Sequence, residues 1–170
     1  MRSLIASVLI WMAAALALAA EPLAKLGVVL LQPSDVLEQR VPSVDVMADY
    51  IKAVEAAARE AVRNGGVRQS TSGFIVIAVK PGLKSKVWLD FDTLVDPETS
   101  RQLIARVTAV EPFEARNGAV VFAVKVSMWD GRESHRIAPS PPEWKAATRQ
   151  AGRQLDIDSM IERVWREPDA

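Results

Sequence analysis

The sequence predicts an α+β domain: a three-stranded antiparallel sheet with two helices packed on one face, followed by a C-terminal helical extension. Apolar residues recur at helical spacing in residues 44–63. Three later apolar segments read as strands, at residues 73–80, 86–92 and 119–129. A second helical segment separates the last two strands, so the order is α-β-β-α-β, which is typical of an α+β plan.

The first helix and a hairpin open the predicted domain, which spans residues 43–131. Ser43 is a favourable N-cap for the helix. Strand 73–80 is apolar on both faces, as a central strand would be, and a Pro-Gly turn follows it. Strand 86–92 alternates instead, which places Val87, Leu89 and Phe91 on the core face and Trp88, Asp90 and Asp92 on the opposite face.

A second helix and a third strand complete the predicted domain. Asp96, Pro97 and Glu98 supply an N-cap, a first-turn proline and a first-turn acid. Strand 119–129 also alternates. One face carries Val120, Phe122, Val124, Val126 and Met128, and the other carries Val121, Ala123, Lys125, Ser127 and Trp129.

The segments that flank the domain are predicted in less detail. Residues 20–42 form an N-terminal arm whose apolar stretch, 27–31, is either a strand or a segment packed on the domain. Residues 132–170 form the helical extension, which covers either the other sheet face or an edge. Ser140 and Glu143 predict a capping box for its first helix, and a second helix begins near residue 157.

Residues 1–19 have the features of a cleavable secretory signal peptide. A single positive charge, Arg2, precedes an apolar run, and Ala17 and Ala19 supply the small residues before the cleavage site. We therefore expect an exported, periplasmic protein without a stable membrane anchor after cleavage. The alternative is an uncleaved signal that anchors the chain in the inner membrane, although Glu21 ends the apolar run early for a spanning helix.

Composition excludes several functional classes. The chain has 21 basic and 21 acidic residues, so it has no excess of positive charge of the kind that binds nucleic acid. It has no cysteine, which rules out disulfides, thiol catalysis and Cys-ligated zinc. The one histidine, His135, is expected in a solvated loop. With no glycine-rich phosphate loop either, we expect no cofactor and no bound metal.

An enzyme would have to use the carboxylates of Asp90, Asp92 and Asp96, which lie close together in the sequence. Their alternation with core residues favours a solvated sheet face, and we expect the protein not to be an enzyme. Trp88 and Trp129 are more informative, because aromatic residues on an otherwise solvated face mark contact sites. The alternative is that the C-terminal helices, with Trp144 and Trp165, cover them.

Residues 44–129 resemble the C-terminal domain of the TonB/TolA type in their order of elements. The hairpin at 73–89 is similar to the first hairpin of that family. The better match runs from the helix at 101–107 through Glu111-Pro112-Phe113 and Asn117-Gly118 into the last strand. The chain lacks the long proline-rich spacer that is usual in this family.

The resemblance implies an interaction module that binds an unknown envelope protein through its sheet. A free sheet edge can accept a partner strand, and the matching element here is the last strand. The alternative is that residues 27–31 or the C-terminal helices cover this edge. The partner-binding residues expected on this basis are Trp88, Val121, Ala123, Lys125, Ser127 and Trp129. The alternative is a periplasmic protein that binds a small ligand or a lipid in a tryptophan-lined cavity between the sheet and the C-terminal helices.

Overall fold

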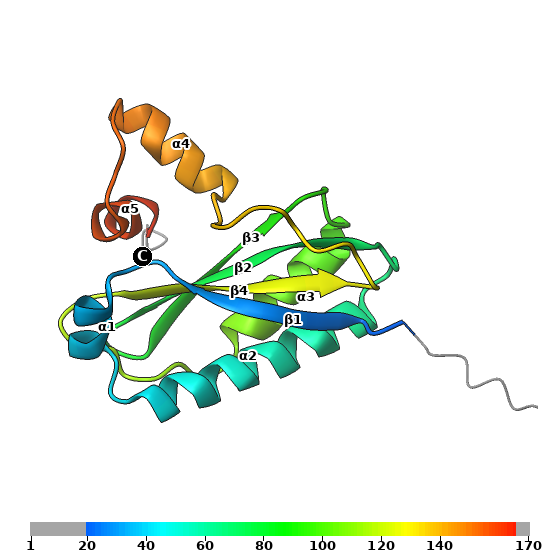
Figure 1. The fold of residues 1–170 in the computed structure, drawn as a ribbon, viewed down its shortest axis with the longest axis horizontal. Coiled ribbons are helices and arrows are strands. Elements are labelled where there is room, and N and C mark those ends of the chain that lie inside the picture. The colour runs from blue at the N-terminus through cyan, green and yellow to red at the C-terminus, as the bar shows by residue number, and fades with distance from the viewer. Residues whose placement is uncertain (1–19, 166–170) are drawn as a thin grey trace, which may run out of the picture.

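The computed structural model describes residues 20–165 and confirms the α+β class (Figure 1). The signal peptide predicted for residues 1–19 lies outside the described residues. The elements run in the order β1 (Leu23–Leu30), α1 (Ser34–Arg40), α2 (Val44–Asn64), β2 (Thr71–Lys80), β3 (Lys84–Phe91), α3 (Pro97–Thr108), β4 (Val120–Met128), α4 (Pro142–Ala151) and α5 (Ile157–Val164). Within residues 20–165, no helix is long and apolar enough to cross a membrane.

The sheet has four antiparallel strands in the order β1-β4-β2-β3, so the prediction of three strands is wrong. The fourth strand is β1, which lies in the N-terminal arm and includes most of the stretch 27–31, for which the sequence allows either a strand or a packed segment. It pairs with β4 along most of its length, with Val28 opposite Val124 and Leu30 opposite Phe122. The last strand is therefore an inner strand, and the open edge expected there is occupied by β1.

The helices α2 and α3 cover one face of the sheet (Figure 1). Their apolar stripes meet the core face predicted for β4 and β3, and the fully buried side chains there include Val54, Leu103 and Phe122. Both predicted N-caps are present. The Ser43 hydroxyl accepts a hydrogen bond from the Val46 N–H at 3.2 Å, and an Asp96 carboxylate oxygen accepts one from the Thr99 N–H at 3.0 Å.

The helices α4 and α5 lie on the opposite side of the sheet and bury a second core (Figure 1). Sheet residues such as Phe74 and Val121 contribute to this core together with Trp144 and Ile161 of the helices. The predicted capping box of α4 is wrong, because the side chain of Ser140 caps nothing. Its backbone N–H instead donates to an Asp90 carboxylate oxygen at 2.6 Å.

Candidate functional site

Most of the residues predicted to bind a partner are in the interior. Trp88 is only 4% exposed, and its ring packs edge-to-face against that of Trp144, with 5.6 Å between the ring centroids. Val121 and Ala123 are fully buried in the same core. Trp144 of α4 therefore packs directly on Trp88, and α4 covers this part of the predicted contact face.

The other three predicted contact residues also have intramolecular partners. Lys125 forms an ion pair with Glu133 at 2.9 Å, and Ser127 is buried. Trp129 lies apart from the rest, because it packs against the α2–α3 core and the Arg68 guanidinium stacks over its ring. The structure does not bring these residues together as one exposed surface.

The three carboxylates considered for catalysis form intramolecular hydrogen bonds and ion pairs. The prediction of a solvated face is wrong for Asp90, which is 7% exposed and pairs with Arg136 at 2.6 Å. Asp92 accepts from Arg136 and from the Ser134 hydroxyl, each at 2.9 Å. These contacts fasten the segment before α4 to the end of β3. Asp96 serves as the α3 N-cap, so each of the three carboxylates has a structural partner.

His135 is exposed, as predicted. In the part of the chain that the structure describes, no group of three or more histidine, aspartate or glutamate residues could hold a metal ion.

The edge of the sheet at β1 is the feature that sequence reasoning missed. The Leu31 N–H donates to the Val121 carbonyl of β4 at 3.3 Å. Backbone groups alternate in direction along a strand, so the N–H and C=O groups of Val29 also point toward β4, and those of Val28 and Leu30 point away from the sheet. Val28 is 39% exposed and Leu30 is 51% exposed. The C-terminal half of β1 is therefore an open, apolar sheet edge.

The N-terminal half of β1 is protected. A bulge interrupts the register between Lys25 and Gly27, and the Arg59 side chain donates to the Leu23 carbonyl at 3.2 Å. Lys25 also pairs with Glu55 of α2 at 3.0 Å. Burial alone would raise the pKa of the Glu55 carboxyl, but hydrogen bonds from Lys25 and Arg59 outweigh it and hold that pKa below its ordinary value. Bulges and charges are the usual devices that block strand edges.

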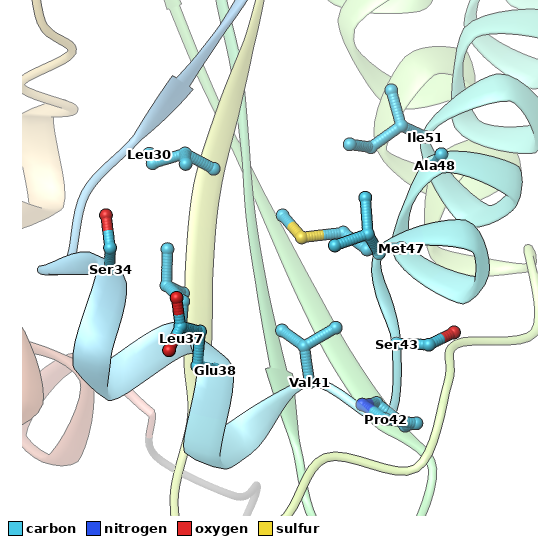
Figure 2. Close-up of a pocket in the computed structure, with 11 residues that line it drawn as sticks. Leu30, Ser34, Leu37, Glu38, Val41, Pro42, Ser43, Met47, Ala48 and Ile51 are labelled. Atoms are coloured by element: carbon cyan, nitrogen blue, oxygen red, sulfur yellow. The ribbon is translucent and has the colours of Figure 1, made fainter.

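An apolar groove adjoins the open half of β1 (Figure 2). It has a volume of about 430 Å³ and lies between the end of β1, the helix α1 and the first turns of α2. Its lining comprises Leu30, Ser34, Leu37, Glu38, Val41, Pro42, Ser43, Val44, Met47, Ala48 and Ile51. We call the outward backbone groups of Val28 and Leu30, together with this groove, the β1 edge site.

Gln32 fixes the end of β1 beside the groove. Its side-chain carbonyl accepts from the Val121 N–H at 2.9 Å, and its side-chain amide donates to the Ala119 carbonyl at 2.9 Å. The side chain thus continues the β1–β4 ladder where the next residue, Pro33, has no N–H to offer. This holds Leu30 at the mouth of the groove.

One signal in the sequence could have indicated this site. The residues from Leu26 to Leu31 carry no charge and no proline, which is unusual for an edge strand. The groove residues Met47 and Ile51 belong to the apolar pattern that predicts the helix at residues 44–63, and this pattern does not distinguish groove residues from core residues. Comparisons with protein-family models, with curated proteins and with solved structures gave no match.

Proposed function

We propose that this chain is an exported, non-enzymatic interaction module that binds an extended segment of an envelope protein along the β1 edge. The observation that carries the proposal is the half-open strand. One half of β1 is blocked by a bulge and ion pairs, whereas Val28 and Leu30 present free backbone groups beside an apolar groove. Backbone hydrogen bonds would supply affinity, and the groove would select side chains.

The resemblance of residues 44–129 to TonB/TolA C-terminal domains supports the same class of function. It implies binding through the sheet, and we transfer that role from the last strand to β1 because β1 occupies the edge of the last strand. The signal-peptide pattern of residues 1–19 supports a periplasmic partner.

A small apolar ligand is the second candidate occupant. The groove volume of about 430 Å³ falls within the range of small-molecule sites. The ligand would occupy the groove and would make no use of the backbone of Val28. The two functions therefore differ in their dependence on the strand edge.

The experiment is site-specific photo-crosslinking in the native cell. A crosslinking residue at position 30 is expected to give a defined adduct with an envelope protein, and one at Leu94, which is 91% exposed on another surface, serves as the control. Adding Val28→Pro is expected to abolish the adduct, because proline removes an outward N–H that the fold does not use. Val28→Thr keeps this N–H and should retain the adduct.

Two results would contradict the proposal. An adduct that persists with Val28→Pro, in a protein whose circular dichroism is unchanged, would mean that the strand edge does not bind the partner. Equal adducts from positions 30 and 94 would mean that the contact at β1 is not specific.

A further inference from the structure

The segment that forms α1 and the first turns of α2 is rich in acidic residues. Between Leu31 and Lys52 the chain has four acidic residues, Asp35, Glu38, Asp45 and Asp49, and two basic residues, Arg40 and Lys52. Lys52 pairs with Asp49 at 3.1 Å. Arg40 is not available to balance the other acidic residues, because its guanidinium is bound to both carboxylate oxygens of Asp158 on α5, at 2.6 and 2.8 Å. The β1 edge site thus combines an apolar groove with a single acidic residue, Glu38, in its lining.

Glu38 is the acidic residue that lines the groove itself (Figure 2). Among residues 20–165 it takes part in none of the ion pairs found. It lies in the last turn of α1, where the helix dipole disfavours a negative charge, so helix stability does not explain it. Asp35 and Asp45, in contrast, lie in first turns, where such charges stabilise a helix.

The geometry points to one class of occupant: an extended peptide segment with alternating apolar residues and a lysine or arginine at the end that reaches Glu38. This inference rests on the proposed function and deepens it. The apolar residues of the segment fill the groove beside Leu30, and its basic residue meets the Glu38 carboxylate.

A second copy of this chain cannot pair with β1 over the full length of the strand. Antiparallel pairing of two β1 strands along their full length would place the open half of one strand against the protected half of the other. That half contains the bulge after Lys25, and Lys25 is already bound to Glu55. A segment from a different protein needs only the open half.

The test is selection from a phage-displayed library of random nine-residue peptides on the immobilised full chain. We expect enriched peptides with alternating Val, Ile or Leu and a Lys or Arg at one end. Selection on Glu38→Lys is expected to replace that basic residue with an acidic one. For the best synthetic peptide, Glu38→Gln should weaken binding about two- to fivefold at low salt. Glu162→Gln, an equal charge change on α5, should leave the affinity unchanged.

The outcomes separate this inference from the proposed function. Enriched apolar segments without a basic preference, or the same preference on Glu38→Lys, would overturn the inference and leave strand addition in place. Absence of any enriched peptide, or enrichment that survives Val28→Pro, would contradict the proposed function. A concentration-dependent dimer in light scattering that Val28→Pro abolishes would identify a second copy as the occupant and overturn the inference.

Discussion

The side-chain amide of Gln32 occupies the place of a peptide group in the β1–β4 ladder. It is buried, and it satisfies both the Val121 N–H and the Ala119 carbonyl. A buried backbone N–H without a partner is costly, because it has lost its hydrogen bond to water. The position of β1, and therefore of the β1 edge site, depends on this residue.

Replacing Gln32 by leucine is expected to lower the free energy of unfolding by about 1–3 kcal/mol, because the Val121 N–H stays buried without an acceptor. Gln39→Leu, at an exposed position of α1, is the matched control and should change it by less than about 0.5 kcal/mol. Urea denaturation measures the free energy of unfolding of both variants. Equal effects from the two variants would show that Gln32 adds nothing beyond an ordinary surface side chain.

At the scale of elements, the β2–β3 hairpin depends on a glycine for close approach. A Cβ at position 73 would lie 2.5 Å from the carbonyl oxygen of Asp90 and from the Cα of Phe91. Both are backbone atoms of β3, so the strands would have to separate. At Gly27 of β1, in contrast, a Cβ would meet nothing within 4 Å.

Gly73→Ala is accordingly expected to destabilise the protein by about 1–3 kcal/mol, as overpacking does. Gly27→Ala should be neutral or stabilise it by up to about 1 kcal/mol, since alanine restricts the unfolded chain. Thermal unfolding of the Gly73→Ala and Gly27→Ala proteins measures the difference in stability between them. A stable Gly73→Ala protein would mean that β2 and β3 are further apart than described.

The elements also differ in how well the sequence predicts them. The helix stripe of α2, the caps at Ser43 and Asp96 and the alternation in β4 are local signals, and the structure confirms them. β1 could not be assigned, because its short apolar run acquires a partner only from β4, nearly a hundred residues later. The choice of edge strand, and with it the candidate site, follows from that non-local pairing.

At the scale of the whole molecule, both faces of the sheet are buried, one in the core with α2 and α3 and the other in the core with α4 and α5. The sequence indicates that β2 is apolar on both faces, which requires cover on both, but it does not show what α4 and α5 bury. Contacts between distant segments decide this. Arg136, in the segment before α4, forms an ion pair with Asp90 of β3, and Arg40 of α1 forms one with Asp158 of α5. The predicted contact residue Trp88 is buried for this reason.

The Arg40–Asp158 contact predicts how acid affects the C-terminal helices. The hydrogen bond from Arg40 holds the pKa of Asp158 below its ordinary value of 3.8. A carboxyl whose pKa is lowered on folding stabilises the folded state above its unfolded pKa, and this contribution is lost as the pH falls through the folded pKa. The contact therefore persists from neutral pH to below pH 3.8.

The near-ultraviolet circular dichroism of the tryptophans in the second core, which include Trp165 at the end of α5, should consequently be constant between pH 7 and pH 5, and should change only below about pH 3.8. Asp158→Asn removes the charge, and its signal is expected to be less resistant to urea at pH 7. A transition near pH 6 in the wild-type protein would contradict this account of how α5 is held.

The central claim is that the open half of β1 accepts a partner strand, and amide hydrogen exchange measured by NMR tests it most directly. In the isolated chain, the N–H groups of Val28 and Leu30 are predicted to exchange fast, whereas that of Val29, which points toward β4, exchanges slowly. The peptide selected on the chain should slow exchange at Val28 and Leu30 and leave Val29 unchanged. Slow exchange of the Val28 and Leu30 N–H groups in the absence of the peptide would contradict the claim. Fast exchange of the same groups when the peptide is bound would also contradict it.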